Sequence, residues 1–256
     1  MADVCVQRNT ITYSAAVKAC ESGGEWTLAL EVFSEMVCTS VARNTITFNA
    51  VVGACEKGGA WTLALHILQE MANDSVDRDT IVFSAAVSAC EKGGAWEHAL
   101  QLLIDMADSS VPKDTITFNA AISACEKGEM WEPALLLLGE MAAERVERNT
   151  ITCNAAVSAC QKGWAWDFAL QLLSEMAVDR VGTDTITFNA AVSACAKGGA
   201  WPWALQLVSG MADDCVERDT DTLQIVAGAC EKGVQYLWTA QLLSQIAIES
   251  SSQPRR

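Results

Sequence analysis

The sequence predicts an all-α protein, an α-solenoid superhelix of seven 35-residue helix-turn-helix repeats with about fourteen short helices. Each repeat contains two short stretches with apolar residues at helical spacing, and no stretch alternates as a half-buried strand would. A unit of fixed length packs mainly on its neighbours, so one stacked array is expected. The repeat is marked by threonines that recur every 35 residues without insertion or deletion: Thr10, Thr45, Thr80, Thr115, Thr150, Thr185 and Thr220.

The repeat phase also sets the boundaries of the array. We assign a single array to residues 10–254, with repeats 10–44, 45–79, 80–114, 115–149, 150–184, 185–219 and a degenerate capping repeat 220–254. In this last repeat Asp221 replaces an isoleucine and Tyr236 a tryptophan, and a solenoid needs such a polar terminal unit. Residues 1–9 match the tail of a preceding repeat, so we expect the array to begin further upstream, and residues 255–256 are a short tail.

The first helix of each repeat is predicted from the residues at its ends. In the second repeat it runs from about Thr45 to Glu56. Asn44 precedes it, and a short side-chain oxygen at this position caps free backbone N–H groups. Alanine-rich sequence continues the helix, and Lys57-Gly58-Gly59 ends it, because glycine readily takes the left-handed conformation.

The second helix of the same repeat is predicted from Trp61 to about Ala72. Pro133 and Pro202 fall in the first turn of the equivalent helices, where proline is tolerated. Helices of about 12 residues are marginally stable alone, so packing between repeats must stabilise them. We expect this packing from a methionine column that ends at Met211 and from six tryptophans: Trp26, Trp61, Trp96, Trp131, Trp166 and Trp201.

The cysteines are predicted to be small buried side chains in a reducing compartment. Equivalent positions in stacked helices lie about 8–10 Å apart, and a disulfide needs Cα atoms within about 7 Å. Seven of the 11 cysteines share one repeat phase: Cys20, Cys55, Cys90, Cys125, Cys160, Cys195 and Cys230. No CxxC pair occurs and the chain has 2 histidines, so we expect no metal site and no cofactor. Nor does the sequence contain a long apolar run or a catalytic constellation, so neither a membrane span nor an enzyme is expected.

Four motifs of the second repeat carry a family resemblance. They are Thr45-Ile-Thr-Phe-Asn49, Cys55-Glu-Lys57-Gly, Ala64-Leu65 and Glu70-Met71, and they resemble the pentatricopeptide repeat. The pattern recurs through the first six repeats and more weakly in the seventh, and its 35-residue length distinguishes it from the shorter tetratricopeptide repeat. The linker Ser75-Val76-Asp-Arg78-Asp79 departs from the family's Gly-Ile-x-Pro-Asp. The tryptophan in the second helix is also a larger residue than the family usually has there.

The resemblance implies an RNA groove lined by first helices, in which one repeat reads one base. The fifth and last residues of a repeat then recognise the base edge: Ser14, Asn44, Asn49, Asp79, Ser84, Asp114, Asn119, Asn149, Asn154, Asp184, Asn189 and Asp219. The second residues are sandwiched between bases: Ile11, Ile46, Ile81, Ile116, Ile151 and Ile186. Lysines near the end of the first helix approach phosphate: Lys57, Lys92, Lys127, Lys162, Lys197 and Lys232.

Each of these columns also has a structural interpretation. The last residues are N-caps, the lysines suit the carboxyl end of a helix, and the isoleucines are equally consistent with a core. The fifth residues favour base recognition, because Asn and Ser are mediocre helix formers and stand mid-helix without a cap or turn to justify them.

The net charge of −15 opposes nucleic-acid binding, because phosphate contacts need cations. Six basic residues fall in the lysine column, and six more precede the first helices: Arg8, Arg43, Arg78, Lys113, Arg148 and Arg218. We interpret both columns as flanking the groove, with acidic residues on the second helices. This arrangement predicts a locally basic groove on an acidic shell and an RNA affinity that is modest and salt-sensitive.

The sequence thus predicts a monomeric, non-enzymatic adaptor that binds single-stranded RNA, and the family's pairing rule implies the readout A-U-G-Y-U-U. The resemblance further implies a role in RNA processing, stability, editing or translation in a mitochondrion or chloroplast. One alternative is a protein-binding α-solenoid scaffold, which the acidic balance favours and the Asn/Ser column disfavours. Another is the recognition half of a longer RNA-processing enzyme.

Overall fold

The computed structural model describes residues 9–213, 216, 219–222, 224–225 and 228. Within them the chain forms twelve helices and no strand, which confirms the all-α helix-turn-helix repeat. The predicted capping repeat 220–254 lies largely outside the described residues, as do residues 1–8. The helices are α1 Thr10–Gly23, α2 Trp26–Cys38, α3 Thr45–Gly58, α4 Trp61–Asn73, α5 Thr80–Lys92, α6 Trp96–Asp108, α7 Thr115–Lys127, α8 Trp131–Ala143, α9 Thr150–Lys162, α10 Trp166–Val178, α11 Thr185–Lys197 and α12 Trp201–Asp213.

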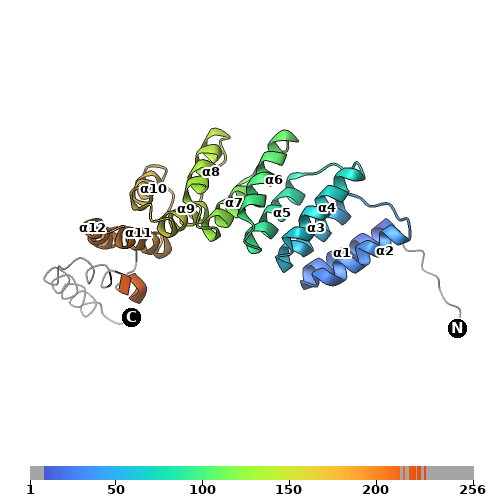
Figure 1. The fold of residues 1–256 in the computed structure, drawn as a ribbon, viewed down its shortest axis with the longest axis horizontal. Helices are drawn as coiled ribbons and strands as arrows, with labels where there is room; N and C mark the ends of the chain where they lie inside the picture. Colours follow the sequence, from blue (N-terminus) through green and yellow to red (C-terminus); the bar gives the residue numbers. More distant parts are fainter. Residues whose placement is uncertain (1–8, 214–215, 217–218, 223, 226–227, 229–256) are drawn as a thin grey trace. The chain divides into compact units, whose positions relative to one another are not determined.

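The chain divides into two compact units, residues 1–147 and 148–256. In the first unit, blue to green in Figure 1, the first helices α1, α3, α5 and α7 pack in series. Each second helix packs on the first helix of its own repeat, and α2, α4 and α6 also pack on the next first helix. In the second unit α9 packs on α11, and α10 lies against both. Within each unit the first helices therefore form one continuous layer, and the second helices form another that packs against it.

The last residue of each repeat caps the next first helix. The Asn44 side chain accepts a hydrogen bond from the backbone N–H of Thr47 at 3.0 Å, and Asp114 accepts one from Thr117 at 2.8 Å. The predicted N-cap is thereby confirmed, and the same contact occurs at Asn9, Asp79, Asn149 and Asp184. At the other end of α3, Gly59 takes the predicted left-handed conformation with φ of 62°.

Tryptophan and methionine pack between helices as predicted. The Trp26 indole lies against Gly58 of the next repeat, so closely that a methyl group at Gly58 would lie 2.5 Å from Cδ1 of Trp26. The same tryptophan-on-glycine contact recurs at Trp61 and Gly93. The methionine column is fully buried: Met36, Met71, Met106, Met141, Met176 and Met211. These contacts are what stabilises helices too short to persist alone.

Hydroxyl groups at the start of the first helices fix the spacing between repeats. The Thr10 hydroxyl donates to the backbone carbonyl of Ala42 at 2.8 Å, and the Thr150 hydroxyl donates to that of Gly182 at 2.9 Å. Each bond spans 32 residues and joins a helix to the linker that closes the same repeat. A linker of altered length would lose this bond, which gives a physical reason for the constant repeat length.

The cysteine column is mostly core, as predicted. Cys55, Cys90, Cys125, Cys160 and Cys195 are buried free thiols, Cys20 is half-buried, and Cys230 lies outside the described residues. Burial raises the pKa of Cys55 to about 11 and that of Cys160 to about 12, so these groups stay protonated. Among the helices that the structure describes, none is long and apolar enough to cross a membrane.

Candidate nucleic-acid interface

Isoleucines at one register of the first helices face solvent. Their exposed fractions run from 63 % at Ile186 to 78 % at Ile11. The interpretation of this column as core is therefore wrong. Single exposed aliphatic side chains are ordinary, but six at one register make a repeated apolar surface along the first helices. These six are Ile11, Ile46, Ile81, Ile116, Ile151 and Ile186.

Asparagines at the fifth position contact the acidic residue that ends the repeat. Asn49 Nδ2 donates to the Asp79 carboxylate at 3.1 Å, and Asn154 Nδ2 donates to the Asp184 carboxylate at 3.0 Å. In the sixth repeat Asn189 Nδ2 lies 3.2 Å from Asp219 Oδ1. The structure thus brings together three of the residue pairs that the sequence assigned to base recognition. Asn119 belongs to the first unit and Asn149 to the second.

Serines at the fifth position behave differently, because they are buried. Ser14 Oγ lies 2.8 Å from Thr47 Oγ1, and Ser84 Oγ lies 2.5 Å from Thr117 Oγ1, in both cases a hydroxyl of the next first helix. Ser14 is 8 % exposed and Ser84 9 %. The argument that no structural role accounts for the Asn/Ser column is therefore wrong, since its members join successive repeats.

Threonines at the third position of the first helices are the partners that the sequence did not reveal. The Thr222 hydroxyl lies 2.6 Å from Asn189 Oδ1 and 2.8 Å from Asp219 Oδ1 and shares its one proton between them, and the Thr187 hydroxyl lies in the same way between Asn154 and Asp184. Val82 stands at this position in the third repeat, and the buried Oδ1 of Asn49 has no hydrogen-bond partner among the described residues. The sequence did contain a signal for these partners, because a threonine recurs one position after the isoleucine in most repeats.

Carboxylates of the Asn–Asp pairs are held in their charged form. Burial by itself would raise the pKa of Asp184, but hydrogen bonds from Thr187 and Asn154 outweigh it and hold the pKa below the usual range of an aspartate. Hydrogen bonds from the backbone N–H and hydroxyl of Thr222 lower the pKa of Asp219 in the same way. At neutral pH both groups are therefore acceptors only, and each orients the asparagine amide that donates to it.

The lysine column is partly neutralised by acids 36 residues earlier. Lys92 Nζ lies 2.8 Å from Glu56 Oε1, and Lys127 Nζ lies 2.5 Å from Glu91 Oε1. Lys57 Nζ donates to a backbone carbonyl of the preceding first helix at 2.7 Å. The predicted basic groove is thus weaker in the first unit than the sequence suggested.

At Lys197 of the second unit the acid 36 residues earlier is missing. Gln161 occupies the glutamate position, and its Nε2 donates to Ser193 Oγ at 2.8 Å. The exposed Lys197 makes no ion pair with a described residue. Lys197 is therefore less neutralised than Lys92 and Lys127 and more readily available to a phosphate.

The described basic residues that precede the first helices are held in ion pairs or lie over phenylalanine rings, so they supply less free positive charge than the sequence suggested. Arg43 is paired with Glu70 at 2.6 Å and Asp74 at 2.5 Å, and its guanidinium lies 5.2 Å from the centre of the Phe33 ring. Lys113 has a side chain only 3 % exposed and is paired with two acids of the following second helix and linker, one of them 2.7 Å away. These cations fasten an acidic second helix to the linker of the preceding repeat. Arg8 and Arg218 lie outside the described residues.

Comparison with known families agrees with the repeat geometry. The pentatricopeptide repeat domain matches residues 1–57, and the PPR repeat matches residues 46–76, 81–111, 116–146 and 186–216, together more than half of the chain. The chain belongs to the pentatricopeptide repeat (PPR) family. A comparison with curated proteins found no match.

Solved PPR structures share the fold. The crystal structure of the PPR protein PPR10 from maize is similar over 97% of this chain and 36% of its own, with 24% identity and a TM-score of 0.71. PPR10 in complex with an 18-nt psaJ RNA element is similar at 16% identity and a TM-score of 0.53, over 98% of this chain and 41% of its own. The PPR domain of Arabidopsis thaliana protein-only RNase P 1 in complex with tRNA is similar at 13% identity and a TM-score of 0.62, over 70% of this chain and 95% of its own. This PPR chain thus spans about a third of the length of maize PPR10.

Proposed function

We propose that this PPR chain is a non-enzymatic adaptor that binds single-stranded RNA along its first helices, with one repeat for each base. The observation that carries the proposal is the exposed isoleucine column, since the same position of all six first helices holds an isoleucine that faces solvent. On the same helices three asparagines are oriented by carboxylates. Solved relatives in complex with RNA support the same use of the fold.

The chemistry of the Asn–Asp pair suits a pyrimidine. Asn154 uses one N–H of its amide on Asp184, and its carbonyl accepts the Thr187 hydroxyl. The second N–H of Nδ2 and the second lone pair of Oδ1 are then fixed in direction. Such a donor and acceptor match the O4 and N3–H of uracil, and unpaired bases are read in this way on their Watson–Crick edges.

A serine repeat presents a shorter side chain, which leaves room for a purine. The family's pairing rule then gives A-U-G-Y-U-U along the chain. The pairs are Ser14 with Asn44 for A, Asn49 with Asp79 for U, Ser84 with Asp114 for G, Asn119 with Asn149 for a pyrimidine, and Asn154 with Asp184 and Asn189 with Asp219 for U. Exposed isoleucines would lie between successive bases, and the lysine column would meet phosphates.

A binding assay with matched oligonucleotides tests the proposal. Fluorescence anisotropy at low salt is expected to show tighter binding of an RNA containing AUGCUU than of its scrambled version. Replacing Asn119→Ser is expected to move the preference at the fourth base from pyrimidine to A, because the serine then pairs with Asn149 as Ser14 does with Asn44. Equal binding of both oligonucleotides, or an inert Asn119→Ser, would contradict base recognition.

We further propose that the RNA target belongs to an organelle, where the adaptor acts in RNA processing, stability, editing or translation. Imaging of the fluorescently tagged full-length protein tests this, and accumulation outside mitochondria and chloroplasts would contradict it.

A further inference from the structure

Second helices α6 and α8 of the first unit enclose an apolar groove of about 300 Å³. Leu100, Leu103 and Ile104 line it from α6, and Pro133, Leu136 and Leu137 line it from α8. Two of these side chains are largely in solvent, since Ile104 is 53 % exposed and Leu136 74 %. The groove lies on the layer of second helices, away from the first helices assigned to RNA.

The register of the repeat shows that this groove is exceptional. At the position of Ile104 the other described second helices carry Ser34, Gln69, Gly139, Ser174 and Ser209. At the position of Leu136 they carry Glu31, His66, Gln101, Gln171 and Gln206. Across these twelve positions, Ile104 and Leu136 are thus the two aliphatic residues, and they line the same groove.

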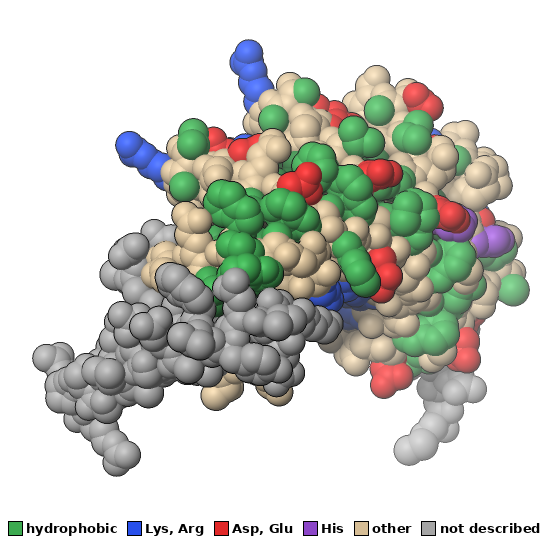
Figure 2. All heavy atoms as spheres, turned by 60° about the vertical axis from the view of Figure 1, so that its left-hand side comes forward, with side chains coloured by type: hydrophobic (Ala, Val, Ile, Leu, Met, Phe, Trp, Pro, Cys, Tyr) green, Lys and Arg blue, Asp and Glu red, His purple; other side chains and the backbone are tan. Residues whose placement is uncertain are grey.

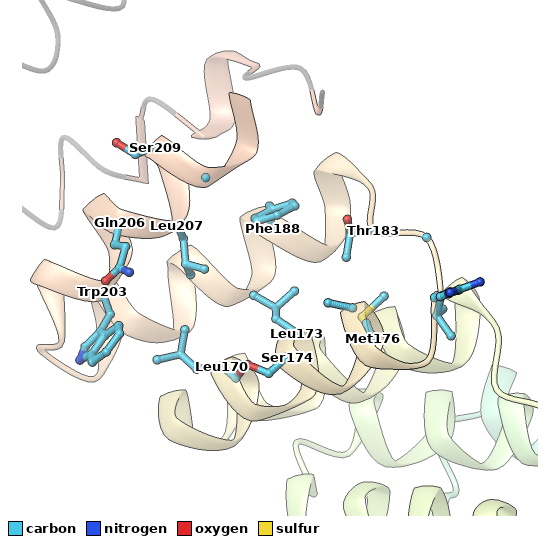
Figure 3. Close-up of a pocket in the computed structure, with 15 residues that line it drawn as sticks. Leu170, Leu173, Ser174, Met176, Thr183, Phe188, Trp203, Gln206, Leu207 and Ser209 are labelled. Atoms are coloured by element: carbon cyan, nitrogen blue, oxygen red, sulfur yellow. The ribbon is translucent and has the colours of Figure 1, made fainter. Parts of the chain in front are cut away.

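An equivalent hollow in the second unit shows what the ordinary repeat places there. The pocket between α10 and α12, which also reaches Phe188 of α11, is lined by Leu170, Leu173, Trp203 and Leu207, and has Ser174 and Gln206 at the positions of Ile104 and Leu136 (Figure 3). Spacing between neighbouring second helices therefore leaves a groove without any special sequence. The exchange of a serine-type and a glutamine-type position for Ile104 and Leu136 makes the α6–α8 groove apolar.

Acidic side chains outnumber basic ones around the groove, where Glu140 is already paired with Lys113 of the preceding linker. The six described second helices contain no lysine or arginine, whereas α6 carries Glu97, Asp105 and Asp108 and α8 carries Glu132 and Glu140. Glu97 and Asp108 stand seven residues before and four after Ile104, so they share its side of α6. Figure 2 shows acidic side chains and fewer basic ones dispersed among exposed hydrophobic side chains on the face in view.

We propose that the α6–α8 groove docks a short amphipathic helix of a partner protein, with aliphatic side chains on one face and lysine or arginine beside them. A groove between two helices accepts the apolar stripe of a third, and the acidic surroundings supply attraction and orientation. A second copy of this chain would bring acid-only helices together, and RNA or an anionic membrane would be repelled in the same way. The proposal is independent of base recognition on the first helices.

A synthetic peptide tests the groove in the full chain. The probe is a fluorescein-labelled peptide with leucine at helical i, i+3 and i+7 spacing and lysine on the flanks. Its control is the same composition in scrambled order. The matched variant is Ile104→Ser with Leu136→Gln, which installs the residues found at Ser174 and Gln206 and leaves the charge unchanged. We expect the variant to bind the ordered peptide at least about tenfold more weakly, with unchanged melting temperature and RNA affinity.

Three results would overturn the proposal. Equal affinity of the wild type and the double variant for the ordered peptide would mean that charge alone attracts it. Equal affinity of the wild type for the ordered and scrambled peptides would also mean that charge alone attracts the peptide. A concentration-dependent dimer in sedimentation velocity that the double variant abolishes would assign the groove to a second copy. Because both side chains are exposed, the single variant Leu136→Gln provides a milder test if the double variant unfolds.

Discussion

Glu56 and Glu91 form ion pairs with two lysines that RNA phosphates would contact. Removing the negative charge of these glutamates is therefore expected to strengthen RNA binding. Their carboxylates lie 2.8 and 2.5 Å from the Nζ atoms of Lys92 and Lys127. A phosphate must displace them before it contacts either lysine. The double variant Glu56→Gln with Glu91→Gln retains side-chain size and hydrogen bonding but removes the competition.

The magnitude follows from the exposure of these pairs. The Lys92 and Lys127 side chains are 41% and 43% exposed, so each ion pair contributes about 0.2–1 kcal/mol after solvent screening. Two pairs sum to about 0.4–2 kcal/mol, which corresponds to about a two- to thirtyfold gain in affinity. The dependence of log affinity on log salt is expected to steepen by about 0.7 for each lysine that gains a phosphate.

Fluorescence anisotropy titrations of the AUGCUU RNA over a salt series measure both quantities. The matched control is Glu31→Gln with Glu97→Gln, which makes the same change in net charge on exposed second-helix positions. Its effect is expected to be smaller, because charges further away than about 8–10 Å are screened. The reasoning is refuted if the control raises RNA affinity as much as Glu56→Gln with Glu91→Gln does. It is also refuted if the latter variant changes neither RNA affinity nor the salt dependence.

Further predictions concern stability. Val82→Thr is expected to raise the free energy of unfolding by about 0.5–1.5 kcal/mol in denaturant titrations, because the threonine hydroxyl would donate to Asn49 Oδ1. An unchanged free energy of unfolding would contradict this. Gly58→Ala is expected to lower the free energy of unfolding by about 1–3 kcal/mol, because the added methyl group clashes with the tryptophan of the preceding repeat. The control Gly139→Ala, whose methyl group would meet nothing within 4 Å, is expected to raise it. Folding lowers the pKa of the Asp184 carboxyl, so its contribution to stability is full above the pKa of an unperturbed aspartate, about 3.9, and is lost as pH falls through the lowered value. The melting-temperature difference between the wild type and Asp184→Asn is expected to shrink in that acidic range. A difference that stays constant with pH would contradict this.

Repeat length, helix bounds and caps could be predicted because each depends on residues close in sequence. Asn44 caps a helix whose third residue is Thr47, and Gly59 ends that helix by its own backbone conformation. The buried methionines were also predictable, because a column repeated on one helix face has the same neighbours in every repeat. These features follow from local chemistry and from periodicity alone.

The partners of the polar and charged columns could not be predicted in this way. Ser14 meets Thr47 and Arg43 meets Glu70, contacts that depend on which face of one repeat lies on the next. A lysine at a helix end is equally compatible with a phosphate or with a glutamate one repeat earlier, as at Lys92. Side-chain spacing along one helix contains no information that separates these outcomes. For the same reason the exposure of Ile46 required the packing to be known.

A strict repeat makes its own exceptions interpretable, because equivalent positions share one environment. Val82 leaves an amide oxygen without its hydroxyl, and Ile104 and Leu136 make one groove apolar where other repeats are polar. Gln161 is the exception with the widest consequence: it bonds Ser193 and supplies no charge to Lys197. In the first unit a phosphate must compete with glutamates for Lys92 and Lys127, whereas no described acid competes for Lys197. The second unit also holds two Asn–Asp pairs assigned to uracil, so it is expected to contribute most of the RNA-binding free energy. Lys197→Gln is therefore expected to weaken RNA binding more than Lys92→Gln does.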